Sequence, residues 1–477
     1  MRTGFRGQDP WTRNHDAAVS RQWSVLKTVI HILGDIGNFP FSFLLMLFLT
    51  ACSVQIYDLQ PIIIGTNTPT PTEVQRRVYV GTTPTVSRKS ETATPPVHIA
   101  PTAISSMTAV NILEITMIDG SIGWGIGQIP GEQDKLVLRT TNTAEHWKNV
   151  TPSQVIYDYA GKVSDIAACF RDGTHAWLIF RDPEGFDAKR GVKIWFTDDG
   201  GTTWNSADLP VSGYSIQRFD EPQIKFLDNQ TGWIFARIGQ VDEREFIGLY
   251  TTHDGGVNWS PMITTGTANL PSATRKNGAV FRDTLEGWIT GENSMSQPGI
   301  VLWHTFDGGN TWYEQMFPEP WGYNIPTGLL SDPSIKCSLD VPKFVDFQYQ
   351  YAWTVLRCNG GSLSEPVSIL YWTYDRLSTW KTVRLPAAEG DLSFYGIEYG
   401  WYAVQNAPGS DFPYQILFTE DGGTNWRTAS QLAWDSKLQF LTPSIGYGIV
   451  TYYGQPALVK TSNSGFSWEQ IFAFVIP

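Results

Sequence analysis

The feature of this sequence that most constrains its fold is a motif that recurs seven times between residues 140 and 468. In its clearest copies the motif reads Thr-x-Asp-Gly-Gly-x-x-Trp, as in the stretch from Thr197 to Trp204. Three weaker copies keep the final Trp, and in two of them Asn142 and Asn463 replace the Asp. The seven copies end at Trp147, Trp204, Trp259, Trp312, Trp380, Trp426 and Trp468. Their mean spacing of about 53 residues indicates a repeat architecture.

A second signal precedes each motif: an apolar segment, a turn, and then an aromatic residue. These aromatic residues are Trp124, Trp177, Trp233, Trp288, Trp353, Trp401 and Tyr447. Thirteen of the 20 Trp therefore occupy two positions of the repeat. Each unit reads as four short strands, here called a, b, c and d in chain order. Seven four-stranded units of this length predict an all-β fold, a seven-bladed β-propeller over residues 109–477.

The motif has a physical role in a tight c–d turn. Asp-Gly and Gly-Gly supply the positive φ angles of the turn, and the carboxylate accepts hydrogen bonds from turn amides. The Trp supplies buried area. We therefore predict structural roles for Asp199, Trp204, Asp254, Trp259, Asp307, Trp312, Asp375, Trp380, Asp421 and Trp426. The alternative role, as cation ligands, is disfavoured because single carboxylates on separate turns do not form a site.

The motif resembles the Asp-box, or bacterial neuraminidase repeat, of sialidases, xyloglucanases and sortilin-like propellers. The wider repeat, F-x-D-x-x-x-G-W followed by T-x-D-G-G-x-T-W, is most similar to the photosystem II stability/assembly factor propellers, over roughly residues 110–477. That resemblance implies a role in assembling or stabilising a membrane complex. In these families the Asp-box lies on turns away from the active site, so the motif implies a fold and not an activity.

The chain ahead of the repeat resembles a bacterial lipoprotein leader. Residues 41–51 are apolar and uncharged, too few to span a bilayer but typical of a signal-peptide core. They end in Leu49-Thr50-Ala51-Cys52, which resembles the lipobox. The resemblance implies acylation of Cys52, cleavage just before it, and an exported protein anchored by lipid at the extracytoplasmic face of the cell membrane. The alternative is a short core strand with an ordinary Cys.

Three segments follow from this interpretation. Residues 1–51 are predicted to be a signal peptide with an unusually long n-region. Residues 52–108 hold the lipobox Cys and a Thr/Pro-rich stretch without hydrophobic period, which predicts a disordered tether. The propeller occupies the remainder.

The variable connections indicate which face of the propeller is functional. Connections b–c and d–a vary in length and emerge on one face, whereas the a–b and c–d turns vary little. The longest, residues 317–343, carries Trp321 and Tyr323 among several Pro residues. These two side chains are candidate binding residues; the alternative is that they pin the loop to the propeller wall. Lys+Arg 34 against Asp+Glu 46 gives a net charge of -12, which argues against nucleic acid as a partner.

Two of the four Cys are candidates for a disulfide. Cys337 is predicted just before strand a of the fifth blade and Cys358 just after strand b, at the same end of adjacent strands. Cys169 lies in a predicted strand a and reads as a buried free thiol.

The sequence lacks the residue sets of several catalytic classes. The Arg-Ile-Pro signature of sialidases is absent, and Arg237 is followed by Ile and Gly. The seven His show no metal spacing, so neither a metal nor a cofactor is predicted. A glycosidase needs two facing carboxylates, and the candidates on the variable face are Asp220, Glu221, Glu319 and Asp332.

The sequence therefore predicts a non-enzymatic binding or assembly/stability scaffold with no catalytic residues. It would present the b–c and d–a face to a protein or glycan. The alternative function is a sialidase-like or xyloglucanase-like glycoside hydrolase.

Overall fold

The computed structural model describes the propeller region of the chain. Described are residues 107–476 except 159–164, 182–185, 188–190, 212–215, 243, 265–274, 293–298, 347 and 453. The predicted signal peptide, Cys52 and the Thr/Pro-rich tether lie outside the described residues.

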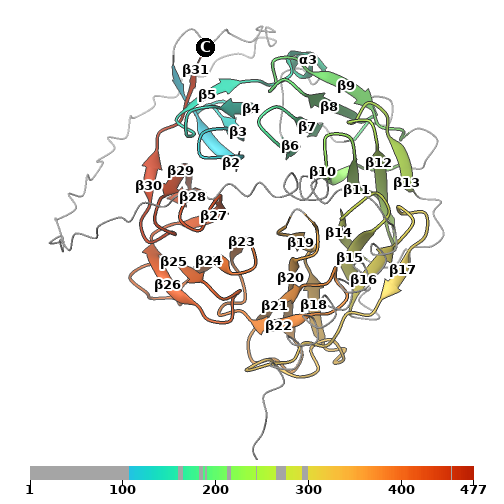
Figure 1. Cartoon of the computed structure of the whole chain (residues 1–477), viewed down its shortest axis with the longest axis vertical. Helices are drawn as coiled ribbons and strands as arrows, with labels where there is room; N and C mark the ends of the chain where they lie inside the picture. The colour runs from blue at the N-terminus through green and yellow to red at the C-terminus, as the bar shows by residue number, and fades with distance from the viewer. Residues whose placement is uncertain are drawn as a thin grey trace, which may run out of the picture. The chain divides into compact units, whose positions relative to one another are not determined.

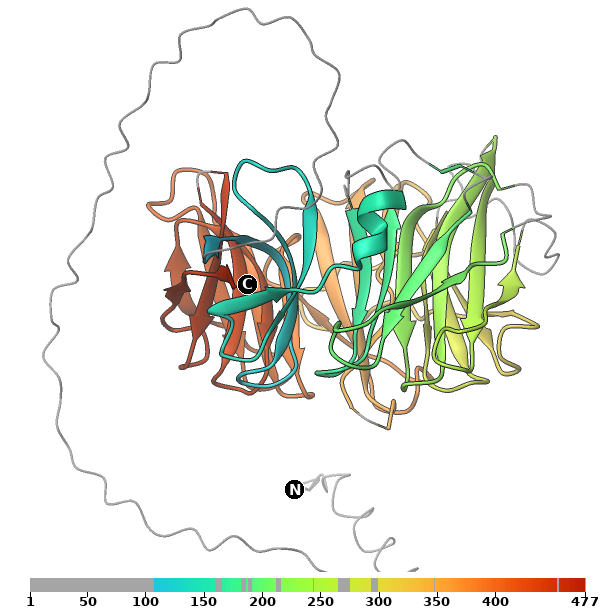
Figure 2. The same ribbon diagram turned by 90° about the horizontal axis from the view of Figure 1, so that it is seen from above.

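Seven antiparallel sheets are arranged in a ring, which confirms the all-β, seven-bladed propeller (Figure 1). Within each blade the strands pair in chain order, with strand a nearest the centre of the ring and strand d at its rim (Figure 1). The b–c and d–a connections consequently emerge on one face, and the a–b and c–d turns on the other. The single described helix, α3 (Ser153–Asp158), belongs to the d–a connection that follows the first blade (Figure 2).

Each of the first four blades is built from four strands that follow one another in the chain. Blade 1 is β2 (Asn111–Met117), β3 (Gly123–Gln128), β4 (Lys135–Thr140) and β5 (His146–Asn149). Blade 2 is β6 (Asp165–Phe170), β7 (Ala176–Arg181), β8 (Lys193–Thr197) and β9 (Asn205–Asp208). Blade 3 is β10 (Asp220–Phe226), β11 (Gly232–Val241), β12 (Arg244–Thr252) and β13 (Ser260–Ile263). Blade 4 is β14 (Arg275–Phe281), β15 (Gly287–Glu292), β16 (Ile300–Thr305) and β17 (Tyr313–Gln315).

The last three blades follow the same plan, with one division of strand a in blade 5. Blade 5 is β18 (Ile335–Leu339), β19 (Lys343–Phe344), β20 (Ala352–Gly360), β21 (Val367–Thr373) and β22 (Lys381–Arg384). Blade 6 is β23 (Asp391–Tyr395), β24 (Tyr399–Gln405), β25 (Tyr414–Thr419) and β26 (Arg427–Leu432). Blade 7 is β27 (Asp435–Phe440), β28 (Gly446–Tyr452), β29 (Gln455–Thr461) and β30 (Glu469–Ile471).

The two ends of the described chain close the ring on blade 1. β31 (Phe474–Ile476) adds outside β5 as a parallel strand, with Val475 opposite Trp147. β1 (Thr108–Ala109) then pairs antiparallel with β31. Val475 is fully buried in the cluster that joins blades 1 and 7. Closure therefore depends on a short strand from the far end of the chain.

Strand a of blade 5 begins earlier than the sequence pattern indicated, and this corrects the predicted positions of two cysteines. Cys337 lies inside β18 and Cys358 inside β20, not beside the strands. The two are direct partners in the antiparallel register, with Cα atoms 4.1 Å apart, and a disulfide joins them. The pattern missed β18 because residues 340–342 interrupt strand a between β18 and β19. Cys169 lies in β6 as a free thiol, partly buried.

The c–d turns formed by the repeated motif, called Asp-box turns here only for their resemblance to that repeat, share one set of hydrogen bonds. In blade 2 the Thr197 hydroxyl donates to Asp199 Oδ1 (2.8 Å) and accepts from the amide of Gly201 (3.0 Å). Asp199 Oδ1 also accepts from the amide of Thr203 (2.9 Å). In blade 1, Asn142 Oδ1 takes the same place and accepts from the amide of His146 (3.0 Å). The Thr hydroxyl and the Asp or Asn side chain together satisfy these amides of the turn.

Where the motif lacks its glycines, the turn keeps the same backbone. Thr143 and Ala144 have φ of 63° and 69°, and Arg376 and Leu377 have 62° and 59°. Such residues cost about 1 kcal/mol or more each in this conformation, so the surrounding bonds impose it.

The Trp of strand b joins each blade to the next. The Trp177 ring of blade 2 stacks on Phe226 of blade 3 with centroids 3.6 Å apart, and its Nε1 donates to the Gly255 carbonyl (2.7 Å). Trp401 of blade 6 stacks on Phe440 of blade 7 in the same way. These rings are buried, so the repeated Trp forms the core between blades.

Candidate functional site

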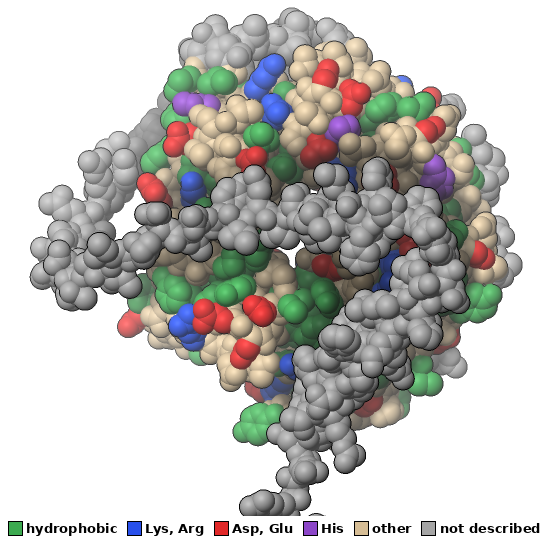
Figure 3. All heavy atoms as spheres, in the orientation of Figure 1, with side chains coloured by type: hydrophobic (Ala, Val, Ile, Leu, Met, Phe, Trp, Pro, Cys, Tyr) green, Lys and Arg blue, Asp and Glu red, His purple; other side chains and the backbone are tan. Residues whose placement is uncertain are grey.

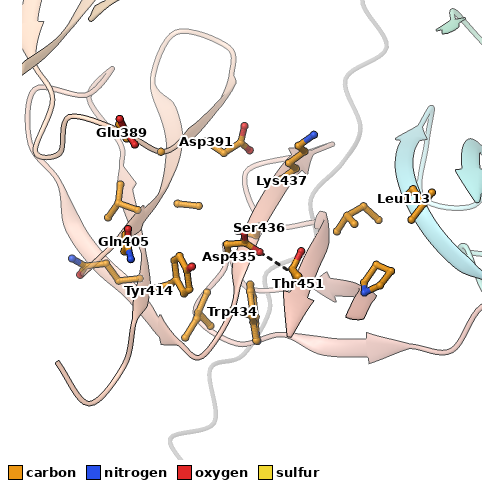
Figure 4. Close-up of a pocket in the computed structure, with 17 residues that line it drawn as sticks. Leu113, Glu389, Asp391, Gln405, Tyr414, Trp434, Asp435, Ser436, Lys437 and Thr451 are labelled. Carbon is orange, nitrogen blue, oxygen red and sulfur yellow. Dashed lines mark hydrogen bonds between the residues drawn. The ribbon is translucent and has the colours of Figure 1, made fainter. Parts of the chain in front are cut away.

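A cavity of about 520 Å³ lies on the b–c and d–a face between blades 6 and 7 (Figure 4). That volume falls within the ~300–1,000 Å³ usual for ligand sites. Its lining residues come from the connections and strands of blades 6 and 7, and Leu113 of blade 1 also lines it. The labelled residues from the two blades are Glu389, Asp391, Gln405, Tyr414, Trp434, Asp435, Ser436, Lys437 and Thr451.

The local sequence explains why polar side chains gather here. Asp391 and Asp435 are the first residues of strands β23 and β27, so both begin strand a at the d–a face. Gln405 ends β24 and Tyr414 begins β25, on either side of the b–c connection of blade 6. They are direct partners in the register.

Asp391 is the most perturbed acid of the cavity. Burial raises its pKa, against the opposing effects of the Leu438 amide, Lys343 and Lys437. The Leu438 amide donates to Asp391 Oδ2 (2.8 Å). A raised pKa in a cavity is a feature of functional sites, so Asp391 is the first residue to test.

Two further carboxylates line the same space. Asp435 Oδ1 accepts from the Thr451 amide (3.2 Å), drawn as a dashed line in Figure 4. Glu389 is exposed and makes no hydrogen bond or ion pair with any described residue. The cavity therefore offers several acceptor oxygens to a ligand.

Aromatic rings supply the apolar part of the lining. Trp434 is half-buried and meets Trp468 edge-on, with centroids 6.1 Å apart and planes at 88°. This packing holds the Trp434 ring in one orientation. Tyr414 is also half-buried.

Charged side chains continue from the cavity toward the centre of the ring. Burial raises the pKa of Glu114 on β2, and Lys437 acts against that shift. Burial lowers the pKa of Lys343 on β19, whose Nζ lies 4.7 Å from the Trp353 ring centroid. Lys437 thus interacts with both Glu114 and Asp391. Figure 3 shows the other face of the ring, which carries the a–b and c–d turns, and acidic and basic side chains are intermixed there too.

The predicted binding residues Trp321 and Tyr323 lie elsewhere, on the rim of blade 5. Their side chains are 78% and 90% exposed, so they do not pin the loop. Hydrogen bonds from side chains of β22 to the loop's backbone hold it instead: the Thr382 hydroxyl donates to the Trp321 carbonyl (2.6 Å), and Arg384 Nη1 donates to the Asn324 carbonyl (2.9 Å). The structure does not bring these two rings to the cavity.

The four acidic residues proposed for a glycosidase each have local partners. Asp220 pairs with Arg181 (3.3 Å) and Glu221 with Arg237 (2.8 Å).

In the connection between blades 4 and 5, Glu319 accepts a hydrogen bond from the Leu330 amide (3.0 Å) and Asp332 accepts one from the Ser334 amide (2.9 Å). Asp220 and Glu221 lie in blade 3, whereas Glu319 and Asp332 lie in this connection, so the four residues do not form one cleft.

The acidic residues of the cavity were not among the residues predicted from the sequence, although the sequence contains a signal for two of them. An Asp begins strand a in four blades: Asp165, Asp220, Asp391 and Asp435. An Asp repeated at the start of strand a indicates the d–a face as a functional surface, as the variable loop lengths also do.

The described residues contain neither a candidate membrane-spanning helix nor a candidate metal site. Within that part of the chain, no helix has the length and apolar character needed to cross a bilayer. Nor do three or more His, Cys, Asp or Glu side chains of the described ranges gather as a metal would require.

Comparison with known proteins gives only distant likenesses. No family model and no curated protein matches the chain. Among solved structures, YCF48 from Cyanidioschyzon merolae is 18% identical, covering 74% of this chain and 96% of that one, with a TM-score of 0.42. The GH74 xyloglucanase from Xanthomonas campestris is 12% identical, covering 78% and 55%, with a TM-score of 0.45. The α-L-arabinofuranosidase Arb93A from Fusarium graminearum is 14% identical, covering 62% and 91%, with a TM-score of 0.37. At these values no function carries over to this chain.

Proposed function

We propose that the chain is a lipid-anchored, extracytoplasmic β-propeller that binds a protein or glycan partner through its b–c and d–a face and performs no catalysis. The observation that carries the proposal is the cavity of about 520 Å³ between blades 6 and 7. It combines half-buried aromatic rings with several hydrogen-bonding side chains, as ligand sites do. The rigid blades hold this lining in place.

The anchor rests on the sequence. Leu49-Thr50-Ala51-Cys52 resembles a lipobox, and the following Thr/Pro-rich stretch suits a tether that holds a propeller away from a membrane. Intact-mass analysis of protein extracted from membranes tests this. Acylated Cys52 as first residue supports the proposal, and a mature chain beginning elsewhere contradicts it.

Site-specific photo-crosslinking tests the binding face. A photoreactive residue at Gln405, in the cavity, is expected to capture a partner in cells. The matched control is the same group at Thr202, exposed on the Asp-box turn of the opposite face. Equal capture at both positions, or at Thr202 alone, contradicts the proposed face.

A second function, glycoside hydrolysis, is favoured by one observation: Glu389, Asp391 and Asp435 line one cavity, and burial raises the pKa of Asp391. A glycosidase acid needs such a shift beside a second carboxylate. Release of reducing sugar from a polysaccharide panel, abolished by Asp391→Asn, would replace the binding proposal. No release from folded protein supports binding.

A further inference from the structure

We propose that the cavity between blades 6 and 7 binds an oligosaccharide of uncharged or amine-bearing sugars and rejects acidic sugars. The inference rests on the proposed binding function and assigns its ligand class. Three properties of the lining support it.

The first property is an aromatic wall. Tyr414 and Trp434 both line the cavity and are half-buried, so each exposes part of its ring. The edge-on contact with Trp468 holds Trp434 before any ligand arrives. A pyranose presents apolar C–H faces that pack on such rings, and a preformed wall loses little entropy on binding.

The second property is the kind of polar group. Gln405 and Gln415 present amides that both donate and accept, and Asp391 and Asp435 present planar carboxylates. Adjacent sugar hydroxyls are paired donors and acceptors, which planar amides and carboxylates match. An extended apolar ligand would leave the remaining hydrogen-bonding capacity of these groups unused, at a cost for each.

The third property is the sign of the charge. Among the described residues, Glu389, Asp391 and Asp435 line the cavity together with one cationic side chain, Lys437, and with no Arg. Lys437 already interacts with Asp391 and with Glu114. A sugar carboxylate or sulfate would meet like charges without the Arg fork that suits such groups, whereas a protonated amine is attracted.

Calorimetry on the full chain tests the inference with three probes: cellotetraose, a glucosamine tetramer and a galacturonic acid tetramer. We expect binding of one or both of the first two, and at least tenfold weaker binding of the acidic tetramer. Trp434→Ala is expected to weaken binding at least tenfold, whereas Trp321→Ala on the rim of blade 5 leaves it unchanged.

Glu389→Lys keeps the test independent of folding, because Glu389 is exposed and has no described hydrogen bond or ion pair. The variant is expected to strengthen galacturonic acid tetramer binding at least threefold and to weaken glucosamine tetramer binding. Equal or tighter binding of the acidic probe by the unmodified chain overturns the inference, as does an unchanged preference in Glu389→Lys.

Failure to bind any of the three probes also overturns it. If capture at Gln405 persists in that case, the proposed binding face survives and its partner is a protein. If capture fails as well, both proposals fail.

Discussion

Removing the carboxylate of one Asp-box turn tests the structural role of the motif. Asp199→Ala deletes an acceptor whose two oxygens receive hydrogen bonds from the Thr197 hydroxyl (2.8 Å), the Thr203 amide (2.9 Å) and the Thr203 hydroxyl (2.7 Å). Asp199→Asn is the matched control, because Asn142 and Asn463 already fill this position in blades 1 and 7.

The magnitude follows from those bonds. One hydrogen bond makes a net contribution to stability of about 0.5–1.5 kcal/mol, and solvent competes for the exposed Asp199. Asp199→Ala should therefore lower the free energy of unfolding by roughly 1–3 kcal/mol. Asp199→Asn keeps the Oδ1 acceptor and should cost less than about 1 kcal/mol. At ~2 cal/mol/K of unfolding entropy per residue, a propeller of this size loses about 1 °C in Tm per kcal/mol.

Calorimetry at pH 7 and at pH 3 measures both variants. Burial works to raise the pKa of Asp199, but hydrogen bonds from Thr203 and Thr197 outweigh it and lower the pKa to about 2. The unfolded value is about 3.9. The stabilisation from this carboxylate is therefore full above pH ~4 and is lost as the pH falls toward 2.

We accordingly expect the Tm difference between Asp199→Ala and the unmodified protein to shrink at pH 3. Two results refute the reasoning: an unchanged Tm for Asp199→Ala at pH 7, or an equal loss for Asp199→Asn. Either shows that the turn does not depend on this acceptor.

The remaining predictions concern other parts of the ring. Thr305→Val leaves the buried Gly309 amide without its 2.8 Å acceptor and should lower the free energy of unfolding by about 1–3 kcal/mol, measured by urea unfolding; no change in the urea midpoint contradicts this. Cys358→Ser removes the disulfide, which joins residues 21 apart in the chain, and should lower the free energy of unfolding by about 3 kcal/mol. A reductant should not destabilise the variant further. Val475→Asp places a charge in the closing strand and should lower Tm far more than Ile476→Asp, whose side chain is 36% exposed; equal effects would argue against closure by β31.

Local patterns explain what could be predicted from sequence. The Asp-box turn closes within eight residues, through bonds such as Thr197 to Asp199 and Thr203 to Asp199, so its residues carry its whole geometry. The strand-b Trp and the repeat length then require seven similar units that bury one another's faces. Where the pattern was interrupted, at β18, the strand was missed.

The candidate site could not be predicted from the sequence because it depends on how neighbouring blades pack against each other. Asp391 and Lys437 line one cavity, yet they lie in strands of different blades, β23 and β27, and only the packing of the two blades brings them together. Composition favoured Trp321, but a hydrogen bond from the Thr382 hydroxyl to the Trp321 carbonyl holds its loop on the rim. Closure is likewise non-local, since β31 pairs with β5 from the other end of the chain. Hydrogen bonds between residues close in the chain can be predicted from a local sequence motif. Contacts between residues far apart in the chain form only when the ring closes, so the motif does not predict them.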